Sequence, residues 1–156
     1  MQKRLACEKN PCPSQLTPSN LRLSNCPVPI DKYNRNLKSF EKALLQLGDA
    51  LEESESPIVR DACLQRFEFS YELLWKTLKV FLEEIHGVRA VSPRQVFKEA
   101  FALSLIEKEQ IFIEMIESRN TLAHTYNEEQ AAKIYVKCAA YLEAMKNVLA
   151  QLNKQT

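Results

Sequence analysis

Glycine is almost absent from this chain, whose 156 residues contain only Gly48 and Gly87. Runs of β-branched residues, the kind that fill β-strands, are also scarce. Both absences argue against a β-rich fold and favour an all-helical protein. With 46% hydrophobic residues, the chain can bury one core of good size, so we expect a single domain.

The sequence also lacks a long apolar run and a strong net charge. No segment is long and apolar enough to span a membrane, and no apolar h-region of a secretory signal is visible. The formal net charge of +1 is too near neutral to indicate a nucleic-acid partner by itself. No basic stripe interleaved with aromatic residues is present, so an RNA-binding surface would have to be a local patch.

The five cysteines fit no paired metal motif, and no metal or other cofactor is expected. Cys7, Cys12 and Cys26 lack a fourth nearby ligand for zinc. Cys63 and Cys138 fall in predicted helices, where they are expected to be small core residues. A reduced, cytoplasmic setting is the simplest interpretation of this cysteine usage.

Residues 1–30 differ from the rest of the chain. They hold five of the seven prolines and show neither a helical nor an alternating pattern. Their four basic residues against one acidic residue give +3, which leaves −2 for residues 31–156. We expect a disordered or loosely docked tail, more often a solvated terminus than an RNA contact, followed by a helical domain at 31–156.

Helix signals recur through residues 31–156. Asp31 is the predicted N-cap of a first helix. Ser56-Pro57 predicts the start of a long second helix, and Gly87 its end beside His86, which we expect to cap it. The first helix has apolar residues at alternating steps of four and three, the seam of an antiparallel bundle: Tyr33, Leu37, Phe40, Leu44, Leu47 and Leu51. The second has a wider apolar face: Ile58, Ala62, Phe67, Tyr71, Leu74, Leu78, Phe81, Leu82 and Ile85.

Three more helices complete the prediction. Ser92 and Gln95 form a capping-box pattern that opens a short helix through Phe101. Another helix starts near Glu107 and leads into Arg119. Asn127 and Gln130 form a second capping-box pattern ahead of the final helix, which starts at Glu128. The expected fold is an antiparallel bundle of four or five helices, running up and down.

The residues with chemical potential crowd into the junction before that last helix. Arg119, Asn120, His124 and Tyr126 lie within eight residues, and Arg119 continues an apolar helical stripe. A guanidinium aimed at a packed surface is costly unless it is paired or used. Positions five apart on an ideal helix point about 140° apart. Arg119 and His124 would therefore share a target only if the helix breaks before His124 or a second copy of the chain supplies the partner.

This set has a catalytic and a structural interpretation. Proton transfer needs a group that titrates near ambient pH, and histidine, here His124, is the residue type that ordinarily does so; a developing phosphate charge needs a fixed cation such as Arg119. Asn120 would orient the imidazole or donate to a phosphate oxygen. In the structural interpretation, which the spacing alone favours, Arg119 pairs with Glu114 or Glu117 and His124 caps the helix.

The stretch from Arg119 to Tyr126 resembles the Arg-x4-His-x-Tyr motif of the HEPN superfamily. Three blocks in order resemble its nucleotidyltransferase substrate-binding branch, the HepT-like toxins: residues 67–79, 92–101 and 124–129. The resemblance spans roughly residues 31–152 and leaves the tail without a counterpart. It implies a homodimerising bundle that brings two motifs together.

The resemblance also implies a function, the toxin of a toxin–antitoxin pair. This would be a metal-independent endoribonuclease that leaves a 2′,3′-cyclic phosphate, with Arg119, Asn120 and His124 as catalytic residues. A minimal nucleotidyltransferase would be the partner that neutralises it by adding AMP to Tyr126. Two alternatives stand beside this one: a noncatalytic subunit that docks a nucleotidyltransferase and helps to bind its nucleotide or acceptor, and a structural bundle whose polar cluster only caps helices.

Overall fold

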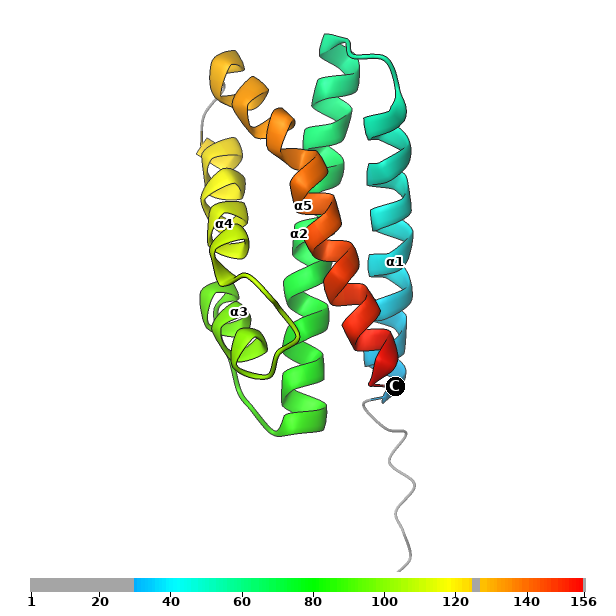
Figure 1. Cartoon of the computed structure of the whole chain (residues 1–156), viewed down its shortest axis with the longest axis vertical. Coiled ribbons are helices and arrows are strands. Elements are labelled where there is room, and N and C mark those ends of the chain that lie inside the picture. Colours follow the sequence, from blue (N-terminus) through cyan, green and yellow to red (C-terminus); the bar gives the residue numbers. More distant parts are fainter. Residues whose placement is uncertain (1–29, 125–126, 156) are drawn as a thin grey trace, which may run out of the picture.

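The computed structural model describes residues 30–124 and 127–155, and within these ranges the chain folds into helices without a strand. Figure 1 shows these helices in chain order. The helices are α1 (Ile30–Glu52), α2 (Pro57–His86), α3 (Pro93–Ala102), α4 (Glu109–His124) and α5 (Glu128–Lys154). The predicted all-helical fold is confirmed.

The helices run up and down in an antiparallel bundle (Figure 1). α1 packs mainly on α2, α5 contacts α1, α2 and α4, and the short α3 packs on α2 and α4. α3 and α4 follow one another along the same side of the molecule (Figure 1). In the described part of the chain, α2 and α4 share little direct contact.

Local capping explains where the helices begin and end. The Ser56 hydroxyl accepts a hydrogen bond from the Val59 amide, and Ser92 does the same for Gln95. The capping box predicted at Ser92 is shifted by one residue. The Gln95 side chain accepts a hydrogen bond from the backbone amide of Val91 and not from that of Ser92. Gly87 ends α2 with a φ of 65°, a left-handed conformation in which glycine avoids a Cβ penalty.

Two cap predictions need correction. α1 begins at Ile30, so Asp31 lies in the first turn, where its carboxylate pairs with Arg35 at 3.4 Å. Asn127 caps α5 by accepting from the Glu129 amide at 2.9 Å. The described residues show no reciprocal bond from Gln130, so the full capping box at this position is wrong.

The core lies between α1, α2 and α5 and extends under α3 and α4. The apolar seam predicted for α1 is buried or half-buried throughout. Rings link the helices: Phe67 of α2 stacks on Tyr141 of α5 with centroids 5.1 Å apart, and Phe97 of α3 meets Phe112 of α4 at 5.3 Å. These contacts join α2 to α5 and α3 to α4, and the packing of α3 on α2 and of α4 on α5 completes the frame around the polar junction.

Some predicted core positions lie outside the core. Ile58 is 80% exposed and Ile85 is 52% exposed, because they fall in the first and last turns of α2. Cys63 and Cys138 are buried in α2 and α5, as predicted. Cys7, Cys12, Cys26 and the proposed tail lie outside the described residues, apart from Ile30.

Candidate functional site

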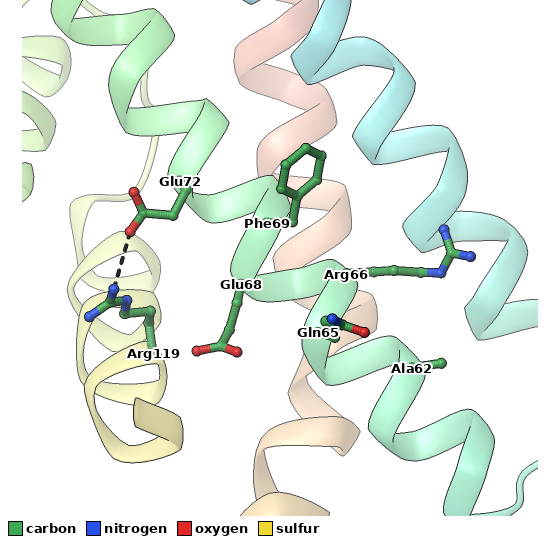
Figure 2. A pocket seen from close by; sticks show the side chains of 7 residues that line it. All are labelled: Ala62, Gln65, Arg66, Glu68, Phe69, Glu72 and Arg119. Carbon is green, nitrogen blue, oxygen red and sulfur yellow. Dashed lines mark ion pairs between the residues drawn. The ribbon is translucent and has the colours of Figure 1, made fainter. Parts of the chain in front are cut away.

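Arg119 lies in the last two turns of α4 and reaches across to α2. Its Nη2 atom lies 3.4 Å from Oε1 of Glu72, as Figure 2 shows. The two side chains are 38% and 31% exposed, so the pair sits at the edge of solvent. The structural interpretation expected Arg119 to pair with Glu114 or Glu117, and this pairing is wrong. Glu114 instead pairs with Lys137 of α5 at 3.6 Å.

Glu72 is held by more than Arg119. Its other carboxylate oxygen, Oε2, accepts a hydrogen bond from the indole Nε1 of Trp75 at 3.1 Å. The ammonium of Lys76 lies 3.1 Å from the same oxygen and also 5.7 Å from the centre of the Trp75 ring. With three donors around it, Glu72 is a fixed anchor for the guanidinium. Trp75 is half-buried, and its indole orients this anchor.

Ser118, the residue before Arg119, is also held in place by a hydrogen bond to another helix. Ser118 is buried, and its hydroxyl lies 2.9 Å from the Tyr141 hydroxyl of α5 in a hydrogen bond. Burial raises the pKa of Tyr141, and the bond to Ser118 opposes part of that rise. Because Tyr141 also stacks on Phe67, this hydrogen bond ties α4 to the aromatic core one residue away from the guanidinium. The Arg119 side chain is thus held by Glu72, and its backbone by the hydrogen bond of the neighbouring Ser118.

The pair between Arg119 and Glu72 also affects Tyr71. Burial, with a smaller contribution from the Glu72 carboxylate, raises the pKa of Tyr71 to about 12, and the Arg119 cation opposes part of this rise. Tyr71 therefore stays protonated near neutral pH. It supplies a buried neutral ring beneath the ion pair and no base.

An open hollow of about 550 Å³ lies beside the ion pair and runs along α2. Figure 2 shows its lining side chains, with Arg119 and Glu72 at one end and Arg66 at the other. The lining also includes the ring of Phe69, which is 56% exposed. A space of this size is in the range of small-ligand sites.

The remaining members of the predicted site are only partly described. Asn120 is exposed in α4, and its side chain contacts no other described residue by a hydrogen bond. α4 extends to His124, so the helix does not break before that residue, and that explanation of the motif is wrong. The His124 side chain and the whole of Tyr126 lie outside the described residues. His86, the other histidine, ends α2 and packs its ring 5.3 Å from Phe81.

Sequence patterns missed Glu72, Ser118 and Tyr141 as parts of this site. All three act between helices, and spacing along one helix cannot show which helix lies opposite. The available signal was the position of Ser118 on the apolar helical stripe that includes Ile111 and Met115, and the acidic Glu72 one helical turn before Trp75. Among the described residues, no group of three or more His, Cys, Asp and Glu side chains is arranged to hold a metal ion.

Comparison with protein families identifies the chain. Residues 34–154 match the family model described as nucleotidyltransferase substrate binding protein like. The chain belongs to this family. Its resemblance to the HepT-like branch of the HEPN superfamily is therefore confirmed.

Relatives of the chain include a curated protein and solved structures. A Haemophilus influenzae protein named probable ribonuclease HepT is 28% identical over 139 residues, which cover 80% of this chain and 95% of that one. A crystal structure of a Thermus thermophilus protein has a TM-score of 0.69 and 35% identity, covering 72% of this chain and 98% of its own.

A further structure agrees in fold. The Haemophilus influenzae protein HI0074, described as showing the fold of a substrate binding domain of a nucleotidyltransferase, has a TM-score of 0.57. It is 24% identical and covers 80% of this chain and 98% of its own. None of the described helices is long and apolar enough to cross a membrane.

Proposed function

We propose that this chain is a HEPN-type toxin that cuts RNA as a metal-independent endoribonuclease. The observation that carries the proposal is the fixed guanidinium of Arg119 at the solvent edge of the bundle, in a motif whose next members are Asn120 and His124. The name of the Haemophilus influenzae relative, a probable ribonuclease, supports the same activity.

The reaction we assign is an internal transesterification. The ribose 2′-oxygen attacks the neighbouring phosphorus, the bond from phosphorus to the 5′-oxygen breaks, and a 2′,3′-cyclic phosphate and a 5′-hydroxyl result. One proton leaves the 2′-hydroxyl and one reaches the 5′-oxygen, and the imidazole of His124 is the group suited to carry it near neutral pH. Arg119 stabilises the added charge on the phosphorane, and Asn120 donates to a phosphate oxygen.

The proposed site needs two copies of the chain. Because α4 continues to His124, the positions of Arg119 and His124 differ by about 140° around an ideal helix axis. One copy therefore does not aim both positions in one direction. A homodimer that juxtaposes two α4 ends supplies the arginine from one protomer and the histidine from its partner.

The proposed partner is a minimal nucleotidyltransferase, in keeping with the description of the family. Transfer of AMP to the Tyr126 hydroxyl joins the tyrosine oxygen to the α-phosphorus and releases pyrophosphate from ATP. The attached phosphate carries negative charge, and it would compete with RNA for Arg119. Tyr126 is thereby a switch residue next to the catalytic set, and the cytoplasm, where ATP and RNA coexist, is the proposed location.

A second function is favoured by the family description itself, which refers to substrate binding. In that case the chain is a noncatalytic subunit that docks a nucleotidyltransferase. Arg119 then binds the phosphate of the nucleotide or acceptor without breaking a bond. The two functions use the same cation and differ in whether His124 transfers a proton.

RNA cleavage by the purified chain separates them. The parent protein, Arg119→Ala and His124→Ala are incubated with RNA in the presence of EDTA, and the new ends are identified by mass spectrometry. We expect cleavage to 2′,3′-cyclic phosphates by the parent and a loss of about 10²- to 10⁴-fold in both variants. Equal cleavage by either variant contradicts the catalytic assignment. No cleavage by the parent, together with nucleotide binding that depends on Arg119, favours the docking subunit.

A further inference from the structure

The hollow along α2, which Arg119 of α4 borders at one end, contains more than a phosphate-binding cation needs. Phe69 is 56% exposed, although Phe67 and Tyr71 on the same helix are fully or almost fully buried. A single exposed phenyl ring is ordinary on a protein surface. This ring, however, lines the same hollow as Arg119, and in Figure 2 it projects from α2 at a point along the helix between Glu72, which holds Arg119, and Arg66.

Two cations with an aromatic ring between them match the chemistry of single-stranded nucleic acid. Bases stack on aromatic rings, and guanidinium groups bind the phosphates on either side. Arg66 is exposed and its side chain forms no ion pair or hydrogen bond with another described residue, so it is available to a ligand. Of these two cations, only Arg119 is paired with a carboxylate, that of Glu72.

A carboxylate in the same hollow restricts which base fits. Glu68 is half-buried, and its side chain pairs with no other described residue. In Figure 2 it extends from α2 on the side nearer to α4. An unpaired carboxylate repels phosphate and base acceptors, so a base that fits beside it presents N–H donors.

Guanine satisfies this requirement better than the other bases. Its Watson–Crick edge presents the N1–H and the N2 amino group side by side, which match the two oxygens of a carboxylate. Uracil offers one N–H flanked by two carbonyl oxygens, and adenine and cytosine place an acceptor nitrogen beside their amino group. A carboxylate therefore discriminates in favour of guanine.

We propose that the hollow lined by Phe69, Glu68 and Arg66 is a base subsite that selects guanine in single-stranded RNA, next to the phosphate bound by Arg119. Phe69 stacks on the base, Glu68 accepts from N1–H and the N2 amino group, and Arg66 binds the phosphate on the far side. The proposal rests on the proposed function, since it places the guanine beside the phosphate that is cut.

Nucleotide binding tests the subsite without using cleavage. The dissociation constants of GMP, AMP, CMP and UMP for the whole chain are measured by isothermal titration calorimetry. We expect GMP to bind about tenfold or more tightly than the other three, the discrimination that a good bidentate edge contact provides. Glu68→Gln removes the preference, whereas Phe69→Leu weakens all four by a similar factor, about fivefold or more.

A matched control uses the other exposed phenyl ring on a helix. Phe101 of α3 is 44% exposed and does not line the hollow, so Phe101→Leu leaves all four dissociation constants unchanged. Equal binding of the four nucleotides, or a preference that survives Glu68→Gln, overturns the proposal. Circular dichroism of each variant confirms that it is folded.

Two further results separate this proposal from its alternatives. If Phe69→Leu converts a dimer to a monomer in light scattering, the ring is covered by a second copy and the subsite is wrong. If GMP binds selectively but the parent chain cuts no RNA, the ribonuclease proposal fails while the subsite stands. If RNA is cut with no preference for a guanine at the cleavage point, the subsite fails while the ribonuclease stands.

Discussion

The guanidinium of Arg119 in α4 lies 3.4 Å from the carboxylate of Glu72 in α2, and this ion pair bridges two helices that otherwise share little contact. Glu72 is in turn fixed by Trp75 and Lys76. The carboxylate both holds the cation in place and competes with any phosphate for it. The first prediction separates these two effects.

Glu72→Gln keeps the size of the side chain and removes its charge. If Glu72 positions Arg119 for the proposed reaction, kcat for RNA cleavage falls about tenfold or more, because the guanidinium is no longer held in one orientation. KM falls as well, because no carboxylate competes with substrate phosphate. Steady-state kinetics with one defined RNA measures both constants.

Glu114→Gln is the matched control for this variant. Glu114 also forms an ion pair between helices, with Lys137 at 3.6 Å, and its side chain is similarly exposed at 38%. It lies outside the hollow, so kcat and KM keep their parent values. Similar kinetic effects from both variants would show that Glu72 acts only through general electrostatics or stability.

The hydrogen bond between Ser118 and Tyr141 contributes to stability. Tyr141→Phe leaves the buried Ser118 hydroxyl without this partner, which costs about 1–3 kcal/mol of unfolding free energy. Ser118→Ala costs a similar amount. The double variant costs clearly less than the sum, because neither buried partner is then left alone. Urea unfolding of the four proteins measures the cycle, and strict additivity would mean that the two hydroxyls do not interact.

Replacing each of the two glycines by alanine is predicted to change the stability of the fold in opposite directions. Gly87 has a φ of 65° and open space where a Cβ would lie. Gly87→Ala therefore lowers the unfolding free energy by about 1 kcal/mol through backbone strain alone. Gly48 lies inside α1, and a Cβ there would be 3.7 Å from Leu142, an ordinary contact. Gly48→Ala therefore raises the unfolding free energy by about 0.5–1 kcal/mol. Thermal melts measure both changes, and a shared sign would contradict the assigned conformations.

Alkaline pH is predicted to destabilise the fold through Cys138. Burial, with a smaller contribution from the nearby Cys63, raises the pKa of this thiol from 9.0 to about 12. The contribution of the buried neutral thiol to the unfolding free energy is complete below pH 9. It is lost as the pH rises from 9 towards 12, because Cys138 of the unfolded chain ionises first. In this window the thiol contributes a slope of about 1.4 kcal/mol per pH unit.

Cys138→Ala isolates the thiol from the other groups that titrate at high pH. The variant is less stable than the parent at pH 7, because it leaves a small cavity. The difference between the two proteins narrows as the pH rises from about 9 to about 10.5, since only the parent carries the thiol. Chemical unfolding under reducing conditions measures it. A constant difference across this window would show that the thiol does not contribute.

The helix boundaries were accessible from sequence because their determinants are local. Ser56, Gly87 and Ser92 each satisfy backbone groups within a few residues of their own position, so the sequence carries the whole signal. The exposure of Ile58 and Ile85 was not accessible. Both continue an apolar helical pattern, and the pattern does not show where the neighbouring helices end.

The site was accessible only in part, for a related reason. Arg119 stood out because a cation on an apolar stripe needs a partner. That partner, Glu72, lies on another helix, and the choice between it and the nearer Glu114 or Glu117 depends on how the helices pack. Ser118 and Tyr141 pair across the bundle in the same way. The roles of Asn120, His124 and Tyr126 stay predictions.

Complementation between two inactive variants tests the central claim most directly, namely that arginine and histidine from different copies meet at one phosphodiester. Arg119→Ala and His124→Ala are co-expressed with different tags, and the heterodimer is purified and assayed for RNA cleavage. A heterodimer retains one complete site of two, so the account predicts about half the activity of the parent dimer. A heterodimer as inactive as its parents, although its composition is verified by mass spectrometry, would contradict the claim.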